Sequence, residues 1–196
     1  MNAIEAAHRL RHQADEILHK RGLEAILQAY GRVFPTGSYA LNAMAWPDLD
    51  INMVLEPDPQ SIQAFFRLGE EIAALDGVAS MKFNNCIFRP VEGWPKGLYW
   101  GIRLETPRQP VPWKIDIWAH DAYQFADNMA LMDRIQAAMT DDARRFIVEV
   151  KQALLTPEGR TPVLSGYHIY QAVLFEGVTD LDGVRNYLRD HGVADV

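Results

Sequence analysis

The spacing of apolar side chains along this chain predicts a mixed α+β protein whose strands all lie before residue 120. Apolar residues at helical spacing predict a helix over residues 2–20, a second helical piece over 23–30 and an amphipathic helix over 60–75. Alternating polar and apolar residues predict a strand over 48–55. Four shorter apolar runs predict further strands over residues 32–36, 78–83, 98–104 and 113–118.

The pattern becomes helical after about residue 121. Helices are predicted over residues 125–139, 141–155, 165–175 and 181–190. The proline-rich segment TPRQPVP, between the strands over 98–104 and 113–118, is consistent with an antiparallel hairpin. We therefore expect an α+β fold, a mixed β-sheet flanked by helices, with residues 1–120 as a catalytic domain and 121–196 as a C-terminal helical region.

Composition narrows the choice of partner and compartment. The 196 residues carry a formal net charge of −7, which argues against a broad surface for binding DNA or RNA. The single cysteine, Cys86, excludes an intramolecular disulfide and a cysteine-based zinc site. The N-terminus lacks the apolar stretch of a secretory signal, and no run is long enough to span a bilayer. We expect a cytoplasmic protein with neither a membrane nor a nucleic-acid partner.

Three aspartates stand at positions that suit metal binding. Asp48 and Asp50 are two residues apart in a predicted strand, so both carboxylates project from one face. Asp116 lies between two isoleucines in another predicted strand. If these strands are neighbours, the three carboxylates converge, and a bound divalent cation makes such a cluster tolerable. All-oxygen ligation favours Mg²⁺, with Mn²⁺ also possible.

A Gly-Ser pair precedes this cluster at the end of a predicted strand. Gly37 allows a backbone to pass close to a ligand, or a positive φ. Ser38 offers a hydroxyl and an amide donor before a short helical segment predicted over residues 39–45, which is a favourable place for phosphate. Phosphate donors beside a carboxylate–metal cluster are the components of phosphoryl transfer.

The combination Gly37-Ser38, Asp48-Leu49-Asp50-Ile51 and Ile115-Asp116-Ile117 resembles the signature of the polymerase-beta-like nucleotidyltransferase superfamily. The resemblance covers about residues 31–120. It implies that Asp48 and Asp50 bind two Mg²⁺ ions and that Asp116 completes one ion site and acts as the general base. It also implies that Ser38 and the Gly37 backbone hold the β- and γ-phosphates. Many small members continue the Gly-Ser turn with Arg-Gly, where this chain has Leu41-Asn42.

Basic and aromatic residues outside the motif have two interpretations each. A lysine of the helical region touching triphosphate recurs among members of the superfamily, so Lys151 is assigned to nucleotide binding by resemblance. Four basic residues lie on or near the predicted sheet: Lys82, Arg89, Arg103 and Lys114. They either contact phosphate or are exposed surface charges, and the second interpretation is favoured. Three aromatic residues lie at the start of the helix predicted over 165–175: Tyr167, His168 and Tyr170. They either stack on a base or pack the helix onto the sheet, and the second interpretation is favoured.

The resemblance implies transfer of a nucleoside monophosphate from an NTP, with ATP expected, to a hydroxyl of a small-molecule acceptor, with pyrophosphate release. Antibiotic-modifying nucleotidyltransferases act in this way. Two alternatives remain open: a protein-adenylylating, antitoxin-like member and a catalytically inactive nucleotide-binding module. RNA tailing is less favoured, because the chain has neither a basic strip nor an RNA-binding extension.

Overall fold

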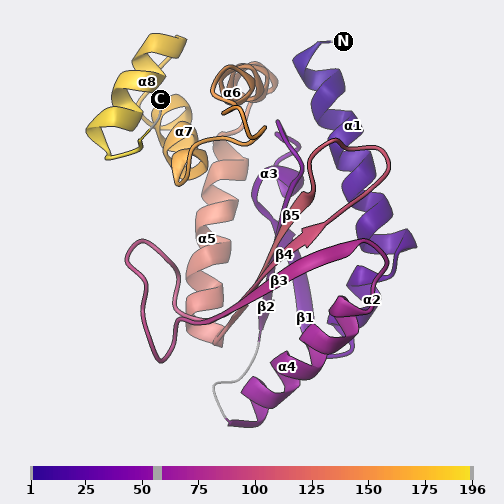
Figure 1. The fold of residues 1–196 in the computed structure, drawn as a ribbon. Coiled ribbons are helices and arrows are strands. Elements are labelled where there is room, and N and C mark those ends of the chain that lie inside the picture. Colours follow the sequence, from indigo (N-terminus) through magenta and orange to yellow (C-terminus); the bar gives the residue numbers. More distant parts are fainter. Residues whose placement is uncertain (1, 55–58, 195–196) are drawn as a thin grey trace.

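The fold comes from a computed structural model that describes residues 2–54 and 59–194, without the side chains of Pro59 and Gln60. Five strands and the helices around them follow one another along the chain (Figure 1). The elements are α1 (Ala3–Asp15), η1 (Glu16–Lys20), α2 (Leu23–Gln28), β1 (Arg32–Thr36), α3 (Gly37–Ala40), β2 (Asp48–Val54), α4 (Pro59–Ala73), β3 (Val78–Asn85), β4 (Leu98–Leu104), β5 (Trp113–His120), α5 (Ala122–Ala138), α6 (Asp141–Ala153), α7 (Ser165–Leu174) and α8 (Leu181–Asp190).

The strands form one mixed sheet in the order β1-β2-β5-β4-β3. Strands β2 and β5 pair in parallel, and the other three pairings are antiparallel. The antiparallel hairpin predicted from the proline-rich segment is confirmed, because β4 pairs with β5 along the whole length of β4. The predicted α+β class is also confirmed. The parallel neighbours β2 and β5 are the two strands that carry the aspartates.

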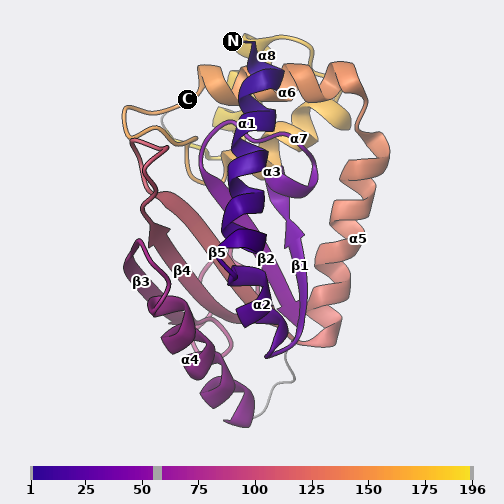
Figure 2. The ribbon, with the colours of Figure 1, turned by 90° about the vertical axis from the view of Figure 1, so that its right-hand side faces the viewer.

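One face of the sheet packs against α1, η1, α2 and α4 (Figure 2). The alternation in β2 and β5 turns Leu49, Ile51, Ile115 and Ile117 toward this layer, and all four are at most 1% exposed. Burial of such apolar side chains is the main favourable contribution to folding. Helix α5 contacts β2 and β5, and the polar side chains of the same strands occupy the remaining face.

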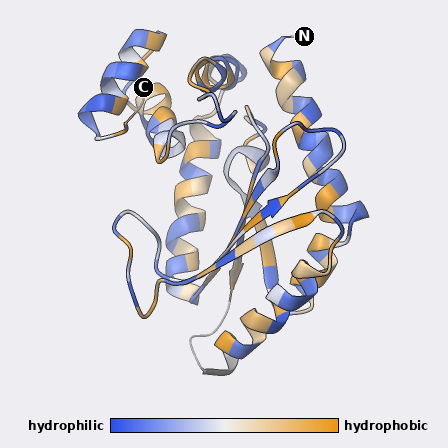
Figure 3. Cartoon of the chain, in the orientation of Figure 1, coloured by the Kyte–Doolittle hydropathy of each residue, from blue (hydrophilic) through white to orange (hydrophobic). Residues whose placement is uncertain are grey.

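A second group of buried apolar side chains joins α6, α7 and α8 to the rest of the molecule. It includes Ala7 from α1 and Leu41 and Ala43 from the segment after α3. Figure 3 shows that hydrophobic and hydrophilic residues alternate along these helices. The C-terminal helices are therefore packed against the residues that follow the Gly-Ser turn, although the predicted division at residue 120 stays a prediction.

The elements differ from the predictions mainly at their ends. Strand β3 continues to Asn85 and β5 to His120, because ladder pairing with β4 and β2 continues beyond the apolar alternation. The predicted first helix changes to a π-helix at Glu16. The short helix predicted over 39–45 instead spans Gly37–Ala40. Residue 55, the last position of the strand predicted over 48–55, lies outside the described residues.

Helix α4 lies so close to the sheet that its contact requires a glycine. A Cβ on Gly69 would lie 2.6 Å from Cζ2 of Trp100, whose indole Nε1 donates to the Phe65 carbonyl oxygen at 2.9 Å. Gly→Ala in a helix normally stabilises it by about 1 kcal/mol. Overpacking against this closely packed, partly buried ring costs about 1–3 kcal/mol, and we expect this cost to exceed the gain.

We predict that Gly69→Ala lowers Tm by roughly 2–4 °C per kcal/mol of net loss, measured by thermal unfolding. Glu70→Ala changes the neighbouring exposed position of α4 and should leave Tm nearly unchanged. A higher Tm for Gly69→Ala would contradict this account of the contact between α4 and the sheet.

Candidate active site

The parallel pairing of β2 with β5 brings the three aspartates together. Asp50 lies directly opposite Asp116, and Asp48 lies opposite Lys114. All four side chains share the face that the buried leucine and isoleucines leave free, since alternate residues of a strand point the same way. The convergence expected from the sequence therefore depends on these two strands being neighbours, and they are.

Lys114 lies between two of the carboxylates. Its Nζ is 3.3 Å from Oδ1 of Asp48 and 2.5 Å from Oδ2 of Asp116. The Tyr99 hydroxyl donates to the other oxygen of Asp116 at 2.9 Å. Both oxygens of Asp116 are thus fixed in place, one by a cation and one by a phenol. Lys114, expected to be either an exposed charge or a phosphate contact, is instead an internal counter-ion.

Three carboxylates share one counter-ion, Lys114, and the pKa values of two of them are raised. Burial raises the pKa of Asp50 to about 8, and the neighbouring charges of Asp48 and Asp116 add to the effect. Burial likewise raises the pKa of Asp48, although Lys114 opposes it. Burial alone would lower the pKa of Lys114, but the fields of Asp48, Asp116 and Asp50 outweigh it and raise that pKa. The cluster therefore favours an additional positive charge.

Gly37 passes its backbone directly against this cluster. Its φ is +60°, a conformation that side chains other than glycine rarely adopt, and a Cβ there would overlap Oδ2 of Asp50. The preceding residue, Thr36, pairs with Asp50 across β1 and β2. Glycine is therefore required at this position for two separate reasons, and the turn predicted from the sequence lies beside the carboxylates.

Ser38 is linked to the C-terminal helices through a buried lysine. Lys151 Nζ donates to Ser38 Oγ at 2.9 Å, to the Tyr170 hydroxyl at 2.7 Å and to the Ala43 carbonyl oxygen at 3.4 Å. Its side chain is 3% exposed, so the three contacts use all the donors of a buried ammonium group. The structure thus places Lys151 of α6 and Tyr170 of α7 at the Gly-Ser turn. From the sequence, Tyr170 is expected either to stack on a base or to pack its helix onto the sheet. In the structure its hydroxyl accepts a hydrogen bond from Lys151.

Aromatic rings continue the carboxylate face from β5 to β4. The ring centroids of Tyr99 and Trp118 are 4.7 Å apart, and Trp94 lies 5.1 Å from the first and 5.5 Å from the second. Gly101 lies opposite Asp116, and a Cβ there would overlap the Tyr99 hydroxyl. The missing side chain at residue 101 therefore lets Tyr99 lie across β4 and reach Asp116.

A buried polar network lies beyond Trp118. His120 Nδ1 donates to the Lys96 carbonyl oxygen at 2.8 Å, and the Asn128 amide of α5 lies 3.1 Å from His120 Nε2. Burial lowers the pKa of His120, which favours the neutral form of its imidazole ring. The His120 ring also stacks on Trp118 at 5.6 Å. This network fixes the end of the segment that carries Trp94.

The sequence interpretation missed Tyr99, Trp94 and Trp118 as part of the site. The alternation in LYWGIRL contains a signal for the first of these, because it places Tyr99 and Gly101 on the face opposite Ile102. It could not show which strand β4 joins. Of the remaining basic candidates, Lys82 and Arg89 are exposed, as favoured, and Arg103 pairs with Lys114 across β4 and β5.

The donor set at the site fits a hard divalent cation, since Asp48, Asp50 and Asp116 offer only carboxylate oxygens. The raised pKa of Asp50 is the observation that supports this fit. Within residues 2–54 and 59–194, however, no group of three histidine, cysteine, aspartate or glutamate side chains is arranged to hold a metal ion.

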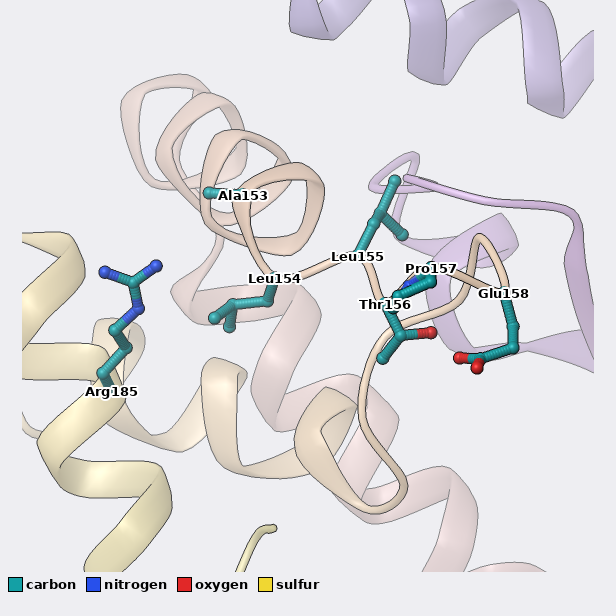
Figure 4. A pocket seen from close by; sticks show the side chains of 7 residues that line it. All are labelled: Ala153, Leu154, Leu155, Thr156, Pro157, Glu158 and Arg185. Carbon is teal, nitrogen blue, oxygen red and sulfur yellow. The ribbon is translucent and has the colours of Figure 1, made fainter. Parts of the chain in front are cut away.

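A separate cavity of about 410 Å³ lies on the helical region (Figure 4). Thr156, Pro157 and Glu158, after the end of α6, line it together with Arg185 of α8. The site residues Asp48, Asp50, Asp116, Gly37, Ser38 and Lys151 do not line this cavity.

In the described part of the chain, no helix is long and apolar enough to cross a membrane.

No protein-family model matches this sequence, and no curated protein matches it. Solved structures do. A GLD-2/RNP-8 complex matches with a TM-score of 0.53 and 11% identity, over 96% of this chain and 58% of that chain. The non canonical poly(A) polymerase complex GLD-2–GLD-3 matches with a TM-score of 0.52 and 13% identity, over 100% of this chain and 62% of that chain.

A weaker likeness is to the small alarmone synthetase 1 from Bacillus subtilis bound to its product pppGpp, with a TM-score of 0.42 and 10% identity, over 74% of this chain and 87% of that chain. This chain spans about three fifths of the GLD-2 chains that it matches. The expected fold is confirmed by the GLD-2 structures: the chain has a nucleotidyltransferase-like fold, a mixed sheet flanked by helices.

The raised pKa of Asp50 gives a prediction for stability. The folded state holds this proton more tightly than the unfolded state, so stability falls as pH rises from about 4 toward 8. Asp50→Asn removes the cost of the buried charge. Each pKa unit is worth about 1.4 kcal/mol, so the metal-free variant should have a Tm higher by at least roughly 3 °C at pH 8.

The gain should vanish near pH 4, where both the folded and the unfolded wild type hold the proton. Thermal unfolding in EDTA across this range measures it. The control is Asp133→Asn, which removes an exposed carboxylate of α5 and should leave Tm unchanged throughout. A gain in Asp50→Asn that does not depend on pH would contradict the electrostatic explanation.

Proposed function

We propose that this protein is a divalent-metal-dependent nucleotidyltransferase that moves a nucleoside monophosphate from an NTP, with ATP as the expected donor, to a hydroxyl of a small-molecule acceptor. The observation that carries the proposal is the register of β2 and β5, which sets Asp50 opposite Asp116 beside the Gly37–Ser38 turn. Carboxylates and phosphate donors at one place are the requirements of phosphoryl transfer.

In the proposed reaction, Gly37 and Ser38 bind the β- and γ-phosphates through backbone amides and the serine hydroxyl. Lys151 contacts Ser38, and its charge slightly opposes the rise in the pKa values of Asp48 and Asp50, so it adds a positive charge beside the same phosphates. Tyr170 holds the Lys151 ammonium group in this position. These residues orient the donor.

Asp116 accepts the proton of the acceptor hydroxyl. The hydroxyl oxygen forms a bond to the α-phosphorus, the bond from that phosphorus to the bridging oxygen breaks, and pyrophosphate leaves. Tyr99 fixes the orientation of the Asp116 carboxylate. Two Mg²⁺ ions, or Mn²⁺, held by Asp48, Asp50 and Asp116 would neutralise the phosphate charge and lower the pKa of the acceptor hydroxyl.

The net charge of −7 supports a small acceptor rather than RNA, since nucleic acids require a positively charged surface. The poly(A) polymerase activity of the GLD-2 complex belongs to that protein, and a shared fold does not carry a shared acceptor. A cytoplasmic location is part of the proposal, because the donor NTP is available there.

We predict that pyrophosphate is released from one of the four NTPs with Mg²⁺ and a hydroxyl-bearing acceptor, and that Asp116→Asn lowers the rate by at least about 100-fold. The variant cannot take up the proton but keeps the size of the side chain. Asp133→Asn, on the exposed side of α5, should retain full turnover.

Undiminished turnover in Asp116→Asn would contradict the assignment of Asp116 as the general base. Labelled ATP incubated with lysate distinguishes the acceptor: a labelled protein band would favour a protein side chain over a small molecule. NTP binding without pyrophosphate release would favour a nucleotide-binding module.

Metal binding has a readout that does not depend on turnover. We predict that Mg²⁺ or Mn²⁺ raises Tm at pH 8, because ligand that binds only the folded state stabilises it by about 2.7 kcal/mol at 100 times its Kd. Asp48→Asn removes one proposed ligand and should reduce this increase. An equal rise in Tm in wild type and Asp48→Asn would place the ion elsewhere.

A further inference from the structure

A layer of three aromatic rings lies beside the carboxylates, and the proposed reaction uses only the hydroxyl of one of them, Tyr99. Tyr99 and Trp118 come from β4 and β5, and Trp94 comes from the segment between β3 and β4. The three rings contact one another at centroid distances of 4.7 to 5.5 Å. Trp94 is 36% exposed and Trp118 is partly exposed, whereas Tyr99 is buried at 7%. Trp94 and Trp118 therefore offer aromatic surface to a bound molecule, and Tyr99 supports them from below.

The layer lies within reach of the proposed base. The Tyr99 hydroxyl donates to Asp116 at 2.9 Å. Trp118 is two residues farther along β5 on the same face, which is about 7 Å along a strand. A ring of five or six atoms that packs on the exposed parts of Trp94 and Trp118 can therefore present one of its hydroxyls toward Asp116.

Sheet order separates this layer from the phosphate donors. Ser38 and Lys151 meet at the end of β1, the aspartates lie on β2 and β5, and the aromatic rings lie on β5 and β4. In phosphoryl transfer the attacking and leaving oxygens lie roughly in line with the phosphorus between them. With pyrophosphate leaving toward β1, the acceptor approaches from β4, where the aromatic layer lies.

The segment that carries Trp94 is anchored at both ends. The Cys86 amide donates to the Gly97 carbonyl oxygen at 2.9 Å, and His120 donates to the Lys96 carbonyl oxygen at 2.8 Å. Between these anchors, Phe88 is 88% exposed. The indole of Trp94 is thus held over Trp118 and Tyr99, while Phe88 on the same segment points into solvent.

We propose that Trp94, Tyr99 and Trp118 form the acceptor subsite and that it takes a hydroxylated sugar or cyclitol ring, neutral or cationic. This inference rests on the proposed function. The C–H face of such a ring packs on aromatic side chains, and an amino substituent gains a cation–π interaction.

The five tryptophans provide the test, because their indole N–H groups give separate NMR signals. Neutral disaccharides, inositols and aminoglycosides are titrated into ¹⁵N-labelled protein. The expected result is a saturable shift of the Trp94 and Trp118 signals by at least one of these rings. Trp113, which is 0% exposed, and Trp100, which packs under α4, should not move. Failure of every ring to move Trp94 or Trp118, or equal shifts of all five signals, overturns the proposal.

Trp94→Ala should weaken the Kd of the bound ring roughly fivefold to tenfold. Phe88→Ala on the same segment is the matched control and should leave that Kd unchanged. Equal Kd values in Trp94→Ala and wild type overturn the subsite. Wild-type ATP binding by Trp94→Ala, measured by calorimetry with Mg²⁺, shows that its donor site is intact.

The two proposals fail in different ways. If rings bind at Trp94 and Trp118 but pyrophosphate is released with no acceptor of any kind, the proposed function is wrong and the ring-binding site stands. If pyrophosphate is released with an acceptor whose KM is the same in Trp94→Ala and Phe88→Ala, the function stands and the subsite is wrong.

Discussion

The parallel pairing of β2 with β5 places like charges side by side, and the arrangement of the site follows from how that repulsion is balanced. Asp50 faces Asp116 in register, and burial strengthens the interaction between them. Lys114 supplies one counter-charge, and Tyr99 holds the remaining oxygen of Asp116. The unbalanced charge is what a divalent cation would neutralise, so the same repulsion that costs stability in the metal-free protein favours metal binding.

A second cation connects the Gly-Ser turn to the C-terminal helices. Lys151, buried on α6, is satisfied only by Ser38, Tyr170 and the Ala43 carbonyl within the described residues. The same helices pack on Ala7 and Leu41 through apolar contacts. The position of the Gly-Ser turn therefore depends on the C-terminal helices, and a phosphate that takes Ser38 or Lys151 as a partner would replace contacts between them.

The fold shared with the GLD-2 structures leaves the acceptor open, because function depends on the groups carried by a fold. In this chain the groups beside Asp116 are aromatic, and Gly101 makes room for one of them. That surface suits the flat face of a ring better than a phosphate backbone. The separate cavity between the end of α6 and α8 has no contact with these groups.

The sequence by itself determined the alternation of β2 and β5, the shared face of Asp48 and Asp50, and the glycine before Ser38, because these depend on local periodicity and backbone freedom. Only the tertiary structure decided that β5 lies beside β2, that Lys114 lies between the carboxylates, and that Lys151 and Tyr99 reach the site. These contacts join residues far apart along the chain. They arise from strand order and helix packing, which local patterns do not specify.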